Sequence, residues 1–131
     1  MSTVLTTAPS TGVLVAKDIE RAKAFYRDKL GLQIEDAGEG QFYVVTGEQT
    51  RFMIYENPNL PAPSNTTLGF IVPNVRAAVT ELRAKGVEFK ELDIPEMKIK
   101  TVDGVASTPE GDAAWFTDTE GNWIALNNMQ G

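Results

Sequence analysis

The chain repeats a short pattern at a fixed spacing, and this repeat constrains its fold more than any other feature. Residues 11–19 (TGVLVAKDI) and 67–75 (TLGFIVPNV) each contain a β-branched run followed by an Asx residue, Asp18 in the first copy and Asn74 in the second. Equivalent positions lie 56 residues apart, since 67 − 11 = 56 and 74 − 18 = 56. A chain of 131 residues has the length of one domain. The sequence therefore predicts a single domain, residues 1–131, built from two similar modules.

Each Asx residue is followed by a helical pattern. Its side-chain oxygen can accept a hydrogen bond from the free amides of a first helical turn, which predicts an N-cap. In the first copy, apolar residues repeat along one face of residues 19–30, and Gly31 can take the left-handed conformation that ends a helix. In the second copy the helix covers residues 75–82 and ends at Gly86. We expect both apolar faces to pack into the core.

Short alternating runs broken by turn residues follow each helix and predict strands. In the first half the expected strands cover residues 32–35, 41–46 and 51–56. In the second half they cover residues 87–92, 113–117 and 123–127, the last two joined by a turn at residues 118–122. Each half then has the order β-α-β-β-β, and the fold class is α+β.

The two modules are joined and distinguished by polar segments. We predict a first module at residues 11–56, a stiff Pro-rich connection at 57–65 and a second module at 66–131. The halves differ mainly by an insertion from residue 90 to about residue 112, rich in Lys, Glu, Pro and Gly. This insertion is too polar for a core segment and longer than an ordinary loop, so we predict a lid or an edge segment.

The composition excludes several kinds of chemistry. The chain has no His and no Cys, which excludes disulfides, thiolate nucleophiles, thiolate or imidazole metal ligands and an imidazole base. Proton transfer would have to use Asp, Glu, Lys, Tyr or water, and any metal would need oxygen ligands. We see no acid/base pair, catalytic triad or phosphate loop in the spacing of the remaining residues.

The net charge and the hydropathy of the chain limit the kinds of partner that we expect. With 12 basic and 18 acidic residues the net charge is −6, which argues against nucleic acid because phosphates require a basic surface. Residues 1–10 lack the basic residue and apolar run of a signal peptide, and no stretch approaches the roughly 20 apolar residues of a membrane span. We expect a cytoplasmic protein with neither nucleic acid nor a membrane as partner.

Two segments carry a resemblance to a known family. They are residues 18–32 (DIERAKAFYRDKLGL) and 116–124 (FTDTEGNWI). Together with the repeat they resemble the vicinal oxygen chelate superfamily, which includes glyoxalase I, extradiol dioxygenases, fosfomycin-resistance enzymes and bleomycin-resistance proteins. The resemblance covers the chain from about residue 11 to residue 127. It implies that the two tandem modules form U-shaped mixed sheets around a concave cleft.

In metal-using members, the resemblance implies four metal ligands, one from the first and one from the last strand of each module. These positions fall on Thr11, Met53, Thr67 and Ala125. Two hydroxyls with Met and Ala cannot hold a divalent ion, because hard cations prefer carboxylates. We therefore expect no metal, no other cofactor and no metal-dependent chemistry. Glu56, near the Met53 position, is either a base or, as we expect, a solvated carboxylate at a strand end.

Strand alternation predicts which side chains line the concave side. If Ile54 and Leu126 point toward the helices, their neighbours along each strand point into the cleft, Asn127 among them. Such a surface contains two Trp and two Tyr and suits a flat organic molecule that stacks on aromatic rings and is oriented by hydroxyls. The predicted ligand-binding residues are Thr11, Tyr43, Met53, Tyr55, Thr67, Trp115, Trp123 and Ala125.

Three functions remain open from the sequence. The first is a metal-independent binding protein of the bleomycin-resistance type, which sequesters a planar organic ligand such as an antibiotic without turnover. The second is a glyoxalase-like lyase or isomerase that acts without the usual metal, and the third is an interaction module whose aromatic residues fill the cavity or an interface. The resemblance implies a homodimer, and the negative charge agrees in sign with a cationic ligand.

Overall fold

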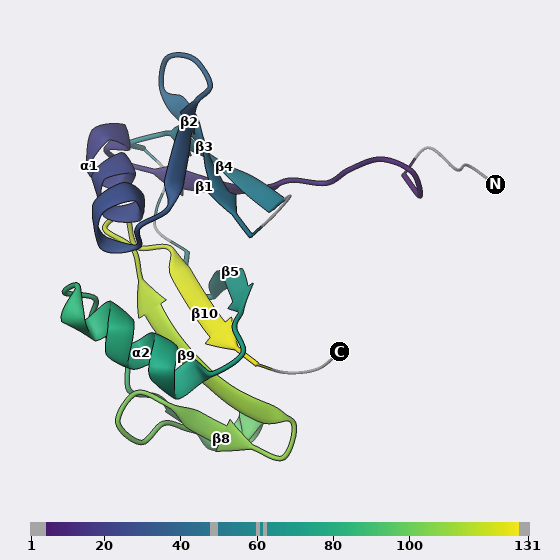
Figure 1. Cartoon of the computed structure of the whole chain (residues 1–131), viewed down its shortest axis with the longest axis vertical. Coiled ribbons are helices and arrows are strands. Elements are labelled where there is room, and N and C mark those ends of the chain that lie inside the picture. Colours follow the sequence, from purple (N-terminus) through teal and green to yellow (C-terminus); the bar gives the residue numbers. More distant parts are fainter. Residues whose placement is uncertain (1–4, 48–49, 60, 62, 129–131) are drawn as a thin grey trace.

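The computed structural model describes residues 5–47, 50–59, 61 and 63–128. Both ends of the predicted domain and part of the predicted 57–65 connection lie outside these residues. In the described part of the chain, each half forms a four-stranded mixed sheet with one α-helix (Figure 1). Neither helix of that part is long and apolar enough to cross a membrane.

The first half forms a sheet with the order β1-β4-β3-β2, in which only β1 and β4 are parallel. The second half forms a sheet with the equivalent order β5-β10-β9-β8, in which only β5 and β10 are parallel. This confirms the α+β class and the two β-α-β-β-β modules. The first module comprises β1 (Gly12–Ala16), α1 (Ile19–Ala24), β2 (Gln33–Asp36), β3 (Gln41–Thr46) and β4 (Thr50–Glu56). The second comprises β5 (Thr66–Ile71), α2 (Val75–Ala84), β8 (Ala106–Thr108), β9 (Gly111–Thr117) and β10 (Trp123–Asn127).

Both helices begin at the predicted Asx residues. Asp18 accepts a hydrogen bond from the amide of Arg21 at 3.1 Å, and Asn74 accepts one from the amide of Ala77 at 3.0 Å. The polar side chain thus satisfies an amide of the first turn that has no partner within the helix. The predicted N-caps are confirmed.

The first helix differs from the predicted regular helix over residues 19–30. It is α-helical only to Ala24 and continues as a π-helical turn, η1 (Phe25–Lys29), closed by a 3.1 Å hydrogen bond from the Leu30 amide to the Phe25 carbonyl. Phe25 and Tyr26 are both buried, although adjacent residues of a regular α-helix point about 100° apart. The wider π-helical turn occurs where these two adjacent side chains are both buried. The hydrophobic pattern of the sequence does not distinguish a π-helical turn from an α-helical one.

The strand prediction for residues 87–92 is wrong. Only Phe89 pairs there, in an isolated antiparallel bridge with Phe116. Beyond it the backbone leaves the sheet because Leu92 pairs with Thr101, whose amide donates to the Leu92 carbonyl at 2.8 Å. The edge of the sheet is formed instead by β8 from the insertion, which confirms the edge prediction for that part.

The rest of the insertion forms a small hairpin and part of the core. The hairpin consists of β6 (Asp93–Ile94), the 3-10 turn η2 (Pro95–Met97) and β7 (Ile99–Lys100). Val105 and Ala106 are 3% and 2% exposed. The expectation that the insertion is too polar for the core is therefore wrong for these two residues, because Ala106 begins β8 and pairs with Ala113 of β9.

A buried polar cluster in the turn of residues 118–122 attaches the second module to the first. Glu120 accepts hydrogen bonds from the amides of Lys17 and Asp18, both at 2.9 Å, and from the Arg21 guanidinium at 2.7 and 3.0 Å. Its side chain is fully buried, whereas that of Arg21 is half exposed. Burial alone would raise the pKa of Glu120, but the hydrogen bonds from Arg21, the Asp18 amide and the Thr119 hydroxyl lower it to about 2.

A second carboxylate in the same turn binds the first helix. The Tyr26 hydroxyl donates to Asp118 Oδ2 at 2.6 Å. Asn122 of this turn also contacts the first module, because its Nδ2 donates to the Val15 carbonyl in β1 at 2.9 Å. We call this contact region between the two modules the seam. Burial and the Asp118 carboxylate raise the pKa of Tyr26 well above its usual value, so the phenol stays protonated and donates.

We predict that Glu120→Gln lowers the free energy of unfolding at pH 7 by about 2 kcal/mol, because the amide loses the charge-assisted hydrogen bonds while Arg21 is solvated enough to limit the loss. The pKa of Glu120 is lowered on folding from 4.5 to about 2. Its stabilisation is therefore complete above the unfolded value and disappears as the pH falls through about 2. Urea unfolding followed by circular dichroism should show the difference between wild type and variant shrinking over this range.

Glu110→Gln is the matched control, because Glu110 is exposed and its replacement should change stability little at any pH. Equal stability of wild type and Glu120→Gln at pH 7 would show that the cluster does not hold the modules together.

Candidate functional site

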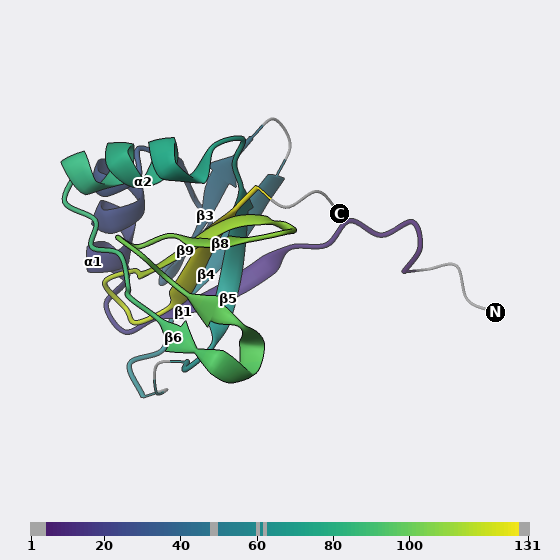
Figure 2. The same cartoon turned by 90° about the horizontal axis from the view of Figure 1, so that it is seen from below.

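The candidate site lies on the sides of the sheets that face away from the helices. In β4, burial alternates along the strand. Phe52 and Ile54 are buried, whereas Met53 and Tyr55, which alternate with them, are partly exposed. In β10, Ile124 and Leu126 are buried toward the helix and Trp123 and Asn127 are partly exposed, but Ala125 between them is also buried, at 9% exposed. Figure 2 shows both helices on one side of the sheets and the β6 region of the insertion on the other. Ile54 and Leu126 thus belong to the core, as the alternation predicts, and the role of the opposite face in ligand binding stays a prediction.

The strand register supports the equivalence of the predicted metal positions. Met53 of β4 pairs with Val13 of β1, and Ala125 of β10 pairs with Gly69 of β5. The two partners are again separated by 56 residues, since 69 − 13 = 56. Met53 and Ala125 therefore occupy the same place in their modules.

The residues at the four positions do not fit a divalent metal. Ala125 has no ligating atom, and Met53 offers only a thioether, which suits soft ions. The Thr67 hydroxyl donates to the Trp123 carbonyl at 3.1 Å, within its own sheet. Thr11 precedes β1 and is exposed. In the described residues no group of three or more acidic side chains is placed to hold a metal ion.

Two tryptophans of the second sheet line a cavity of about 400 Å3. Trp115 in β9 pairs with Ala125, and Trp123 begins the adjacent strand β10. This volume lies in the range of small-molecule pockets, which are lined mainly by apolar and aromatic groups with a few polar ones. The other residues that line it are Leu92, Ile94, Met97 and Ile99 from the insertion and Ser64, Asn65 and Thr66 before and in β5.

The insertion supplies the apolar wall that the sequence analysis missed. Its hairpin is held by Thr101, which is 6% exposed and whose hydroxyl accepts from the Leu92 amide at 2.7 Å. The available signal was the placement of Leu92, Ile94 and Ile99 among charged residues. The high overall polarity of the segment obscured these apolar positions.

A cation also reaches this site. Lys90 Nζ lies 5.7 Å from the centre of the Trp123 ring, a cation–π distance. The Lys90 amide donates to the Trp115 carbonyl at 2.8 Å, which fixes the start of the insertion beside the tryptophans. Lys90 therefore covers part of the Trp123 ring, and a cationic ligand on the same face would have to compete with it.

The remaining predicted residues form a separate surface on the first sheet. Tyr43 pairs with Met53, and Tyr55 lies two residues further along β4. The Arg51 guanidinium stacks 4.2 Å from the centre of the Tyr43 ring and forms a 3.3 Å ion pair with Glu35. None of these residues lines the tryptophan cavity. The predicted set is thus divided between the two modules, with Trp115, Trp123, Thr67 and Ala125 in the second and Thr11, Tyr43, Met53 and Tyr55 in the first.

Glu56 caps a helix. Its Oε2 accepts a hydrogen bond from the amide of Ile19 at 3.0 Å, at the first turn of α1. This contact is an additional N-terminal interaction for α1 beside the Asp18 cap. Glu56 is thus exposed at the strand end, as predicted, and its hydrogen bond to the amide of Ile19 is a contact that the sequence analysis did not predict.

The chain was compared with known families and structures. The model of the Glyoxalase/Bleomycin resistance protein/Dioxygenase superfamily matches residues 7–126. No curated protein is significantly similar in sequence.

Several solved structures share the fold. A bleomycin resistance determinant encoded on the transposon Tn5 has a TM-score of 0.71 and 17% sequence identity, over 95% of this chain and 100% of that one. TnmS3, an antibiotic binding protein from Streptomyces sp. CB03234, has a TM-score of 0.66 and 23% identity, over 95% and 98%. The fosfomycin resistance protein FosX from Listeria monocytogenes has a TM-score of 0.65 and 19% identity, over 92% of each chain.

We predict that the purified, dialysed protein contains no stoichiometric Zn, Ni, Fe or Mn in elemental analysis, because the four positions lack ligating side chains. Chelator should leave the Tm unchanged, since removal of an ion bound to the folded state would lower it. A double variant, Thr67→His with Ala125→Glu, places two ligands on one face of neighbouring strands and should acquire measurable Ni2+ or Zn2+ affinity. One tightly held ion per wild-type chain, with a lower Tm in chelator, would contradict the prediction.

Proposed function

The chain belongs to the Glyoxalase/Bleomycin resistance protein/Dioxygenase superfamily, and from this premise we propose that it binds a small planar organic molecule without a metal ion and without turnover. The observation that carries the proposal is the cavity lined by Trp115 and Trp123 in a chain whose four metal positions hold no suitable ligands. Paired aromatic rings give a flat ligand a large apolar contact, and the polar residues at the start of β5 can orient it.

An antibiotic is the ligand class that we favour. Two proteins with similar folds are described as a bleomycin resistance determinant and an antibiotic binding protein. For this chain the argument rests on the site itself: metal-using members polarise substrate oxygens with the ion, and Thr11, Met53, Thr67 and Ala125 supply no such group. Sequestration needs only affinity, which the cavity can provide.

We propose that the protein is a homodimer. Val13 and Ile71 are 54% and 80% exposed, on strands β1 and β5 at the open edges of the two sheets. Open edges with exposed apolar side chains favour association, because they present unpaired backbone groups and apolar surface to water. A second copy would cover this surface and the separate group of Tyr43, Met53 and Tyr55.

We predict that a planar aromatic antibiotic which enters the cavity quenches or shifts the tryptophan emission, because Trp115 and Trp123 are the two tryptophans of the chain. Trp123→Ala should weaken binding by roughly tenfold. The ring is expected to contribute about 1.4 kcal/mol to the binding free energy, and this amount corresponds to a tenfold change in affinity. A fluorescence screen of aromatic antibiotics and metabolites, followed by calorimetry with the hits, measures both effects.

Val102→Ala is the control for this experiment, because Val102 is 68% exposed and does not line the cavity. Its affinity should equal that of wild type. Consumption of a hit in the presence of chelator would replace sequestration by metal-independent catalysis. If no compound perturbs the emission, the interaction-module hypothesis replaces the binding protein.

We predict that light scattering at micromolar concentration gives the mass of a dimer. Ile71→Glu and Val13→Glu should shift the equilibrium toward monomer, because each places a charge in the proposed apolar contact. Val102→Glu changes an equally exposed apolar residue outside the two sheet edges and should leave the dimer intact. A monomeric wild-type protein would reject the proposal.

A further inference from the structure

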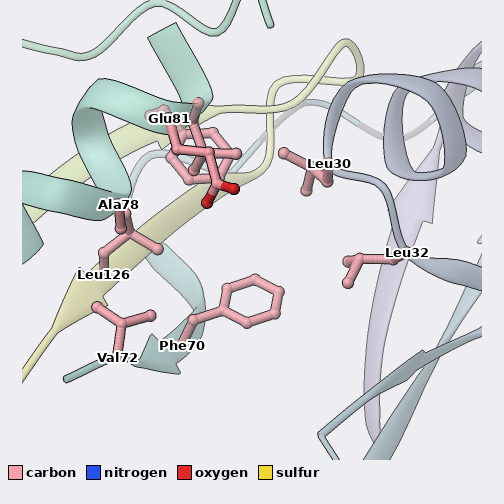
Figure 3. A pocket seen from close by; sticks show the side chains of 9 residues that line it. Leu30, Leu32, Phe70, Val72, Ala78, Glu81 and Leu126 are labelled. Atoms are coloured by element: carbon pink, nitrogen blue, oxygen red, sulfur yellow. The ribbon is translucent and has the colours of Figure 1, made fainter. Parts of the chain in front are cut away.

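A second cavity lies between helix α2, the sheet of the second module and the end of the first helix (Figure 3). It is on the helix side of that sheet, because its lining residues Phe116 and Leu126 belong to the core. Its volume is about 160 Å3. The residues that line it are Leu30, Leu32, Phe70, Val72, Ala78, Glu81, Leu82, Phe116 and Leu126.

The cavity is an unfilled part of the apolar layer at the seam between the modules. Phe116 and Leu126 are 1% and 3% exposed and belong to the buried core. Leu30 and Leu32 reach it from the first module, after the π-helical turn, and Phe70 reaches it from β5. Phe70 and Val72 are only partly buried, so the cavity opens to solvent on one side, and its volume is close to that of a cavity that accepts benzene.

Glu81 is the one charged residue among those that line this cavity, and it is exposed at the rim. Glu81 lies three residues after Ala78 on α2, on the face that borders the cavity. In Figure 3 its carboxylate is turned over the space between Ala78, Leu30 and Phe70. Within residues 5–47, 50–59, 61 and 63–128, the Glu81 side chain has no hydrogen bond or ion pair.

Two lysines lie near the same rim, but neither forms an ion pair with Glu81. Lys85 follows Glu81 by one helical turn, but its Nζ lies beside Gly31, 3.2 Å from where a Cβ of that residue would be. Lys29 likewise reaches across the seam, and its Nζ donates to the Gly86 carbonyl at 3.4 Å. The two lysines thus lie where the ends of the two helices meet, beside Leu30 and Leu32 of the cavity, and the Glu81 carboxylate itself has no ion-pair partner among the described residues.

From these observations we infer a second binding site, for a small lipophilic cation in which one six-membered ring or a short branched chain carries an ammonium group. The ring occupies the space between Phe70, Phe116 and Leu126, and the ammonium meets the Glu81 carboxylate at the rim. This site is independent of the tryptophan cavity and goes beyond the function proposed above.

The test uses the full-length protein with 13C-labelled methyl groups and three probes of the same size and different charge: benzylamine, benzyl alcohol and benzoate. We expect benzylamine to shift the methyl signals of Leu30, Val72 and Leu82 saturably. Because an ion pair at a partly solvated site contributes a modest free energy, benzylamine should bind about threefold or more tightly than benzyl alcohol. Benzoate should bind most weakly.

Four variants separate the contributions to binding. Glu81→Gln should make the affinities of benzylamine and benzyl alcohol equal, whereas Glu110→Gln, at an exposed carboxylate elsewhere, should keep the preference. Ala78→Met should fill the space and abolish binding of both probes, with circular dichroism to show that it is folded. Trp123→Ala should bind benzylamine like wild type, so failure of the tryptophan site and of this site are distinguishable.

Several results would overturn the inference. These are equal binding of benzoate and benzylamine, no shift of the lining methyls at the highest benzylamine concentration, or shifts confined to residues of the tryptophan cavity. A change of the Leu30, Val72 and Leu82 signals with protein concentration alone would mean that a second copy covers the cavity, and this would also overturn it.

Discussion

The arrangement of the two modules depends on the carboxylates of the 118–122 turn. Glu120 is withdrawn from water and satisfied by two backbone amides, the Arg21 guanidinium and a hydroxyl, while Asp118 accepts from Tyr26. A buried charge with incomplete partners would destabilise the seam, but in the described residues no buried polar side-chain atom lacks a partner. The contacts reach the start of α1, its π-helical turn and, through Asn122, strand β1. They therefore hold the first module against the last hairpin of the second.

The two modules are attached on the helix side of their sheets, and this leaves the opposite face of each sheet without a helix. Aromatic packing from Tyr26 through Phe52 to Phe70 fills the seam near the cluster, with ring centres 5.7 and 6.4 Å apart. The side chains that alternate with this core face away from the helices, where the second sheet has no helix to cover it. The insertion covers part of that face instead and converts exposed tryptophans into the walls of a cavity. The tryptophan cavity is thus a consequence of leaving one sheet face without a helix.

Local signals made most of the fold predictable. Asp18 and Asn74 could be identified as caps because their bonds are made within three residues, and strands β3 and β10 follow a clear alternation. The strand at residues 87–92 could not be excluded in this way, since the pairing of Leu92 with Thr101 replaces sheet pairing and depends on a contact nine residues away. The sequence also predicts that Trp115 and Trp123 lie close together, because they are on adjacent strands. In the structure both line the same cavity. Their separation from Tyr43 and Tyr55 depends on how the sheets are oriented, which no local pattern encodes.

The position of Lys90 restricts how a ligand can enter the tryptophan cavity. A cation 5.7 Å from the Trp123 ring already interacts with its electron-rich face. A cationic ligand that stacked on this face would have to displace Lys90 against charge repulsion. A neutral flat ligand can instead stack on the ring surface that borders Trp115 and the insertion, where Leu92, Ile94 and Ile99 provide apolar contact. The negative net charge of the whole chain is therefore a weaker guide to the ligand than this one lysine, because the local charge at the ring is positive.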